Sequence, residues 1–225
     1  MATKEEKLTV GKKVNNFLDK NKAKLIGVLI LFVCFIIGFI IGSVISVNAK
    51  EKNLAEIEQI SYDLTKDSAT LEDAEITARI DEAYTKLADY TKKSGIVGVR
   101  ANLLYADLLF RQGKFQDAIS YYEKVVSLKS KAYTAPLALY NMAVCYEEIN
   151  DMENASENYK KAADSKDFFL YTHAKFSYGR TLEALGKYAD AVQVYTALND
   201  EVPQDSWANL AKTRILTLQA EGKVE

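Results

Sequence analysis

Gly113-Lys-Phe-Gln-Asp-Ala118-Ile-Ser-Tyr-Tyr122 is the stretch that decides the fold, because its pattern occurs twice more in the chain. A turn residue, an alanine five positions later and a tyrosine four positions after that return as Asn150, Ala155 and Tyr159, and then as Gly186, Ala191 and Tyr195. The alanines lie 37 and then 36 residues apart. A period of this length with fixed offsets is typical of stacked helical hairpins, so the sequence predicts an all-α solenoid.

Each hairpin should consist of two helices that meet at the turn residue. In the middle hairpin we expect Pro136 to open a helix that ends near Asn150, where the left-handed backbone is tolerated as it is at Gly113 and Gly186. Ala155 should lie where the two helices cross, and a larger side chain there would cost about 1–3 kcal/mol.

These residues resemble the tetratricopeptide repeat over residues 99–203. The pairs Tyr105-Ala106, Met142-Ala143 and Tyr178-Gly179 correspond to the pair of a large and a small residue in that family, and the three alanines to its central alanine. No repeat has the family's early tryptophan, and only the third ends with a proline, Pro203. Gly179 within a helix would cost about 1 kcal/mol relative to alanine unless it permits close packing.

The whole chain divides into five predicted parts. They are a basic segment (1–24), a transmembrane helix (25–47), a helical linker with a degenerate repeat (48–95), three tetratricopeptide repeats (96–204) and a C-terminal capping helix (205–225). In the degenerate repeat, residues 76–93 form the expected second helix, with a partner from 53–66 or beyond. Trp207 in the cap is interpreted as a packing residue, because terminal repeats need a cover for their last apolar face.

The segment from Leu25 to Val47 has 23 residues without a charge, enough to cross a bilayer. Six lysines in the 20 residues before it and three in the 20 after it predict a cytoplasmic N-terminus. The repeats would then lie on the other side of the membrane, which in a bacterium means an inner-membrane protein with a periplasmic domain. Val47-Asn-Ala49 resembles a signal-peptide cleavage site, but the apolar run is about twice the usual length, which favours retention.

Two features near the membrane have open interpretations. Gly38, Gly42 and Ser46 form a small-residue stripe through which the helix could pair with itself or with another subunit, although glycine is also common in membrane helices. Residues 3–24 could form a basic amphipathic helix on an anionic leaflet, or a tail whose lysines only set the topology.

The charge distribution argues against nucleic acid as a partner. The net charge is −2, but residues 1–24 carry +4 and residues 51–225 about −7, whereas phosphate binding needs clustered lysine and arginine. The two cysteines, Cys34 and Cys145, lie in an apolar run and a predicted repeat helix, so we expect no disulfide between them.

The sequence has no pattern that indicates catalysis. His173 is the single histidine, no cysteine pair has metal-ligand spacing, and phosphate-binding and nucleophile-elbow motifs are absent. We therefore expect no enzyme activity, cofactor or metal.

The resemblance implies that partner proteins bind a groove lined by the first helix of each repeat. The corresponding positions are Arg100, Leu103, Asp107, Phe110 and Arg111 in the first repeat, Leu137, Tyr140, Val144, Glu147 and Glu148 in the second, and His173, Phe176, Arg180 and Glu183 in the third. Aromatic residues among scattered charges suit an extended or helical peptide with apolar anchors. The subgroup that clamps a C-terminal carboxylate is not matched, since Asp107 stands where that subgroup has an amide.

The order of a basic lead, one membrane helix, a linker and tetratricopeptide units resembles the YfgM-like ancillary subunits of the bacterial Sec translocon. This resemblance implies a scaffold that assists secretory proteins, in contact with translocon subunits, secretory chains or periplasmic chaperones. The alternatives are a scaffold for outer-membrane protein assembly or division-site wall synthesis, and a receptor whose repeats lie in the cytoplasm.

Overall fold

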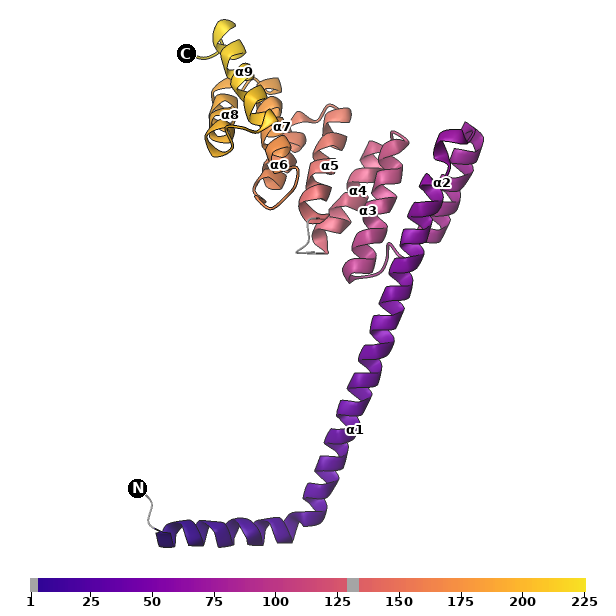
Figure 1. Cartoon of the computed structure of the whole chain (residues 1–225), viewed down its shortest axis with the longest axis vertical. Coiled ribbons are helices and arrows are strands. Elements are labelled where there is room, and N and C mark those ends of the chain that lie inside the picture. The colour runs from indigo at the N-terminus through magenta and orange to yellow at the C-terminus, as the bar shows by residue number, and fades with distance from the viewer. Residues whose placement is uncertain (1–3, 129–133) are drawn as a thin grey trace. The chain divides into compact units, whose positions relative to one another are not determined.

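The computed structural model describes residues 4–128 and 134–225, and over these residues it contains helices and no strand (Figure 1). The all-α class predicted from the repeats is therefore confirmed. The chain forms two compact units that meet between Lys52 and Asn53, and each unit is described by itself.

The first unit consists of the N-terminal part of helix α1, which runs from Lys4 to Thr65. The segment from 4 to 24 is helical, and the apolar side chains between Leu25 and Val47 are exposed along α1. This stretch reaches a mean hydropathy of 3.1, so by length and composition it is a candidate membrane span. At Gly38 and Gly42, no atom beyond the adjacent residues and the local helix backbone lies within 4 Å of the position that a Cβ would occupy, so α1 has open space beside both glycines.

The second unit begins with the end of α1 and α2 (Asp73–Leu87). Ile57 and Ile60 of α1 share a core with Ala83 and Leu87 of α2 and with Val97 of the next helix. The sequence placed this second helix at 76–93, which was wrong at both ends. A capping box between Glu72 and Glu75 starts α2 earlier, and turns replace the helix after Leu87.

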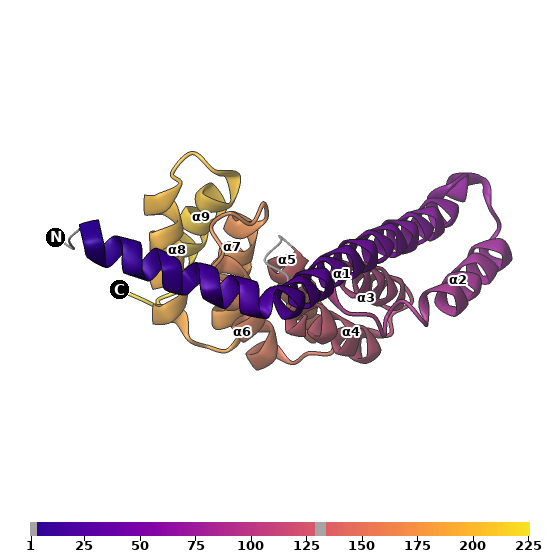
Figure 2. The same cartoon turned by 90° about the horizontal axis from the view of Figure 1, so that it is seen from below.

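Three hairpins follow as α3/α4, α5/α6 and α7/α8, one after another in Figure 1, and Figure 2 shows α5 and α7 on the opposite side of the row from α4 and α6. The helix bounds are α3 Gly95–Arg111, α4 Phe115–Ser127, α5 Thr134–Glu148, α6 Met152–Ala163, α7 Tyr171–Ala184 and α8 Tyr188–Glu201. Helix α5 starts two residues before Pro136, which falls in its first turn, where no intrahelical N–H bond is lost.

The predicted corners and crossings are confirmed. Gly113, Asn150 and Gly186 have φ angles of 70°, 60° and 72°, in the left-handed region. The three central alanines, Ala118, Ala155 and Ala191, are completely buried. A larger side chain at these positions would therefore separate the helices of its hairpin.

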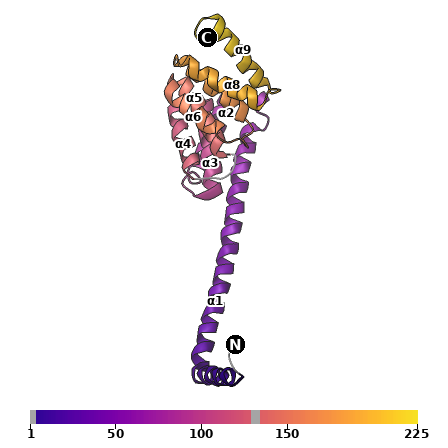
Figure 3. The ribbon, with the colours of Figure 1, turned by 90° about the vertical axis from the view of Figure 1, so that its left-hand side faces the viewer.

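The last helix, α9 (Ser206–Ala220), covers the end of the row next to α8 (Figure 3). The side chain of Asp205 caps it by accepting a hydrogen bond from the backbone N–H of Trp207 at 2.8 Å. Ala208, Ala211 and Leu218 of α9 are buried, and the first two share a core with Tyr195. The predicted capping role of this helix agrees with its packing.

Gly179 permits close packing, which offsets the unfavourable helix propensity of glycine. A Cβ at this position would lie 2.4 Å from a ring carbon of the buried Tyr195. The absence of a side chain therefore lets α8 place a whole tyrosine ring against α7.

Candidate functional site

The candidate site is the inner surface, defined as the surface formed by the first helices of the hairpins, α3, α5 and α7, together with α9. All fourteen predicted groove residues lie on α3, α5 or α7. The side chains of Arg111, Glu148 and Arg180 are exposed, and the other eleven are partly buried.

One hydrogen bond recurs in every hairpin. The tyrosine nine residues after the turn is buried on the second helix and donates its hydroxyl to a carboxylate on the first helix. The pairs are Tyr122 with Asp107 (2.6 Å), Tyr159 with Glu147 (2.8 Å) and Tyr195 with Glu183 (2.6 Å). Burial, with the neighbouring carboxylate, raises the pKa of all three tyrosines, so their hydroxyls remain donors.

Two of the three carboxylates are also paired with an arginine of the next helix on the inner surface. Arg180 of α7 lies 2.6 Å and 2.7 Å from the two carboxylate oxygens of Glu147. Arg214 of α9 donates to both carboxylate oxygens of Glu183, from Nε at 3.1 Å and from Nη2. Burial alone would raise the pKa of Glu183, but the hydrogen bonds from Arg214 and Tyr195 outweigh it and hold that pKa below its usual value.

The first hairpin departs from this arrangement. Glu147 and Glu183 stand three residues before their turns, where the first hairpin has Phe110, and its carboxylate is one helical turn earlier at Asp107. The position of Arg180, six residues before its turn, is Val144 in α5. Asp107 forms no ion pair with any residue in the described ranges.

Asp107 receives its hydrogen bonds from neutral groups. Tyr122 and, at 3.5 Å, the amide of Asn141 both donate to Oδ1. Burial raises the pKa of Asp107, although Tyr122, Arg111 and Asn141 oppose this shift. The carboxylate is therefore poorly neutralised at its position.

A pocket of about 370 Å³ opens beside Asp107. Helices α3 and α5 supply most of its walls, and the lining residues are Asp107, Phe110, Arg111, Tyr122, Tyr140, Asn141 and Val144. Phe110, Val144 and the tyrosine rings thus supply apolar surface beside the polar groups of Asp107, Arg111 and Asn141, a combination that can hold a side chain with an apolar stem and a polar end.

Aromatic rings fill the inner surface further along the row. The His173 ring stacks on Trp207 with centroids 3.8 Å apart and planes at 7°, and the Tyr140 hydroxyl lies 3.0 Å from Nδ1 of His173. Phe176 also contacts Trp207, which agrees with a packing role for that tryptophan. Burial, with the charge of Arg180, lowers the pKa of His173.

The predicted groove residues outside the pocket have other partners. Arg100 lies 3.6 Å from Glu58 of α1, Leu103 packs against the core of the first hairpin, and Leu137 packs against the core near Phe168. Trp207 was interpreted as a packing residue, which its stacking on His173 supports, and the predicted groove residues did not include Tyr122, Asn141 and Arg214. The recurring tyrosine was a visible signal for the first of these, but nothing in the repeat pattern pointed to the others.

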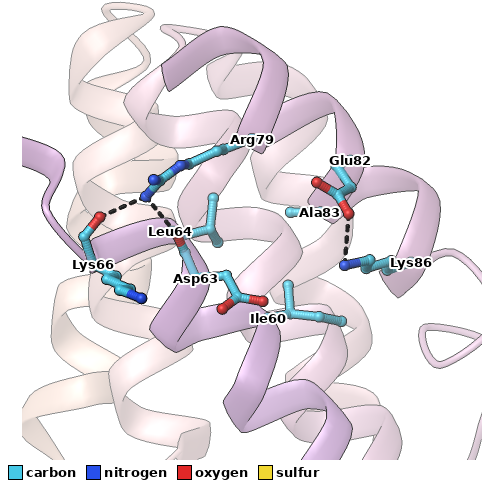
Figure 4. Close-up of a pocket in the computed structure, with 8 residues that line it drawn as sticks. All are labelled: Ile60, Asp63, Leu64, Lys66, Arg79, Glu82, Ala83 and Lys86. Atoms are coloured by element: carbon cyan, nitrogen blue, oxygen red, sulfur yellow. Dashed lines mark hydrogen bonds and ion pairs between the residues drawn. The ribbon is translucent and has the colours of Figure 1, made fainter. Parts of the chain in front are cut away.

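Two further pockets contain polar side chains that pair within the chain. In the first, of about 260 Å³, Arg79 donates to the backbone carbonyls of Asp63 and Lys66, and Lys86 pairs with Glu82 (Figure 4). This pocket joins α1 to α2. The second, of about 460 Å³, lies beside α8, and in it Lys175 pairs with Glu201 at 2.8 Å.

No group of three or more potential metal ligands occurs among the described residues. Both cysteines are free, as expected from their positions in the sequence, and Cys145 is buried.

Comparison with known proteins agrees with the helical hairpins. The tetratricopeptide-repeat family model matches residues 99–167. A TPR repeat-containing protein of Treponema pallidum (strain Nichols) is 31% identical over 130 residues, which are 58% of this chain and 54% of that protein. The chain thus spans about half the length of this relative. The photosystem I assembly protein Ycf3 of Synechococcus sp. (strain CC9311) is 30% identical over 125 residues, covering 50% of this chain and 70% of that protein.

Solved structures share the fold at low sequence identity. A crystal structure of MamA protein has a TM-score of 0.52 at 19% identity and covers 75% of this chain and 85% of its own. A crystal structure of the nearly identical TPR-like repeats of a Podosopora anserina kinesin light chain has a TM-score of 0.57 at 12% identity. It covers 76% of this chain and 88% of its own.

The stacked hairpins and their inner surface define a helical-repeat scaffold of the kind that mediates protein–protein interaction. The chain belongs to the tetratricopeptide-repeat family. Neither the family nor the described side chains point to catalysis.

Proposed function

We propose that this protein is a membrane-anchored scaffold whose inner surface binds segments of other proteins. The observation that carries the proposal is the pocket beside Asp107, which adds apolar walls to a surface whose neighbouring carboxylates are paired internally. The exposed apolar stretch of α1 supports the anchor, since exposed apolar side chains on a helix of this length suit a lipid environment.

The finer form of the proposal places the scaffold at the bacterial Sec translocon, with the N-terminus in the cytoplasm and the repeats in the periplasm. The order of lysine-rich lead, apolar helix and repeats supports this placement. Tethering the inner surface beside a channel raises its effective concentration near emerging chains, so weak contacts suffice.

The second candidate is a scaffold for the assembly of another envelope machine, such as outer-membrane protein assembly or division-site wall synthesis. It is favoured by the similarity to a relative that is named as an assembly protein. Co-purification after mild detergent extraction separates the two candidates, through translocon subunits in one case and assembly or wall enzymes in the other.

Photo-crosslinking in intact cells tests the binding surface. Probes at Phe110, Tyr140 and Phe176 should capture other proteins, whereas matched probes at the exposed outer positions Glu123 and Glu157 should capture few. Capture by the outer probes alone would show that the wrong surface has been assigned.

A reporter fusion tests the topology. Alkaline phosphatase joined after Glu225 should be active, because the enzyme works only outside the cytoplasm. An inactive, stably produced fusion would place the repeats in the cytoplasm and contradict both envelope candidates.

A further inference from the structure

The carboxylates of the inner surface differ in whether an arginine pairs with them. Glu147 and Glu183 each have a tyrosine donor within the hairpin and an arginine from the next helix of the inner surface. Asp107 has the tyrosine donor, stands one helical turn earlier than the two glutamates, and lines the same pocket as Val144, which occupies in α5 the repeat position of Arg180. Among the described residues, two of these three tyrosine-bonded carboxylates are therefore paired with an arginine, and Asp107 is not.

An open pocket lies beside the carboxylate that has no arginine partner. Val144 and Asp107 line the same pocket of about 370 Å³, and Phe110 stands where the other hairpins have glutamate. Both hydrogen bonds to Asp107 end on Oδ1, and Oδ2 accepts none from the described residues. One carboxylate oxygen thus remains available to a donor from outside the chain.

We propose that the pocket between α3 and α5 binds an arginine or lysine side chain of a partner protein, which completes the third carboxylate–cation pair in trans. This inference rests on the proposed function, because it names the chemistry of the segment that the inner surface binds.

The walls of the pocket also suit a basic side chain, in addition to the carboxylate of Asp107. The methylene stem of a basic residue packs on apolar surface while its head pairs with a carboxylate. Phe110 and Tyr140 add aromatic faces, which attract guanidinium and ammonium groups. Arg111 is the one cation among the lining residues, and it is exposed and forms no ion pair with Asp107 within the described part of the chain.

Small probes test the pocket in the full chain held in lipid nanodiscs. n-Butylguanidinium carries the stem and head of arginine, and n-butylurea has a similar shape without the charge. Titration is followed through the aromatic NMR resonances of Phe110, assigned by Phe110→Leu, because this lining residue is retained in every variant tested.

We expect n-butylguanidinium to bind about fivefold more tightly than n-butylurea, as a partly exposed charge pair allows. Asp107→Asn should remove this difference, and Glu123→Gln, which neutralises an exposed carboxylate on α4, should preserve it. Val144→Arg supplies the cation within the chain and should abolish binding of n-butylguanidinium, whether or not Asp107→Asn folds.

Equal affinity for the two probes, or tighter binding of n-butylurea, would overturn the inference and make the pocket an apolar one. Preserved discrimination in Asp107→Asn would also overturn it. Neither result bears on the crosslinking that tests the proposed function, since inner-surface probes can capture partners that insert no basic side chain.

Discussion

The two ends of the carboxylate series offer a test of the electrostatics of the inner surface. Asp107→Asn and Glu183→Gln each replace a carboxylate by an amide of nearly the same shape, and each amide oxygen can still accept the tyrosine hydrogen bond. The carboxylates differ in that Arg214 pairs with Glu183 and no residue forms an ion pair with Asp107 in the described ranges. The two substitutions should therefore change the free energy of unfolding in opposite directions.

The magnitudes follow from the partners. Glu183→Gln replaces the charged acceptor of the hydrogen bonds from Arg214 by a neutral one. Hydrogen bonds to charged groups normally contribute about 1.5–3 kcal/mol, but the Arg214 side chain is 41% exposed. We therefore expect the free energy of unfolding to fall by about 1–2 kcal/mol. Asp107→Asn removes a buried carboxylate. Burial raises the pKa of Asp107, so ionisation of this carboxylate destabilises the folded state at a pH above that pKa. This variant should therefore be more stable than the parent at pH 7.

Acid should remove both differences. The lowered pKa of Glu183 means that its stabilising pair is present above the unfolded value of 4.5 and is lost as the pH falls through the folded value. The raised pKa of Asp107 means that its penalty is absent below the unfolded value of 3.8 and grows as the pH rises through the folded value.

Urea unfolding of the full chain in detergent, followed by helical circular dichroism and by the fluorescence of the single tryptophan, Trp207, provides the assay at pH 7 and at pH 3. Glu123→Gln is the control for loss of an exposed carboxylate. Equal signs at pH 7 for the two substitutions, or differences that persist unchanged at pH 3, would refute the reasoning.

Three other substitutions or conditions give direct expectations. Gly179→Ala should lower the free energy of unfolding by about 1–3 kcal/mol, measured by urea unfolding, because its Cβ would meet the Tyr195 ring at 2.4 Å. Asn150→Ala should lower the melting temperature through a loss of about 1 kcal/mol, and Asn150→Gly should not, because the φ of 60° suits glycine. The lowered pKa of His173 means that the unfolded chain binds this proton first, so stability should fall as the pH drops through 6.5, and His173→Gln should flatten the melting profile there.

The sequence was sufficient for the parts of the fold that depend on local geometry. Left-handed corners at Gly113, Asn150 and Gly186 and the small residue at each helix crossing follow from steric rules that act within one hairpin. The bounds of α2 did not follow, because the capping of Glu72 by Glu75 competes with the apolar spacing further along.

The pairing of side chains between hairpins could not be predicted in the same way. Arg180 meets Glu147 across 33 positions, and the meeting depends on how far one hairpin is rotated against the next. Asn141 and Arg214 carried no sequence signal for the same reason. Whether the fourteen predicted groove residues bind partners stays a prediction, and the structure adds that Arg100 has Glu58 as a neighbour.

The uneven distribution of arginines has a mechanical consequence for the row of hairpins. Ion pairs join α5 to α7 and α7 to α9, so the later hairpins and the cap resist sliding against one another. Between the described helices α3 and α5 no such ion pair forms. The hydrogen bond from the Asn141 amide to Asp107 Oδ1, at 3.5 Å, offers little resistance to sliding. Flexing of the row should concentrate at this joint, and a basic side chain from outside would lock it.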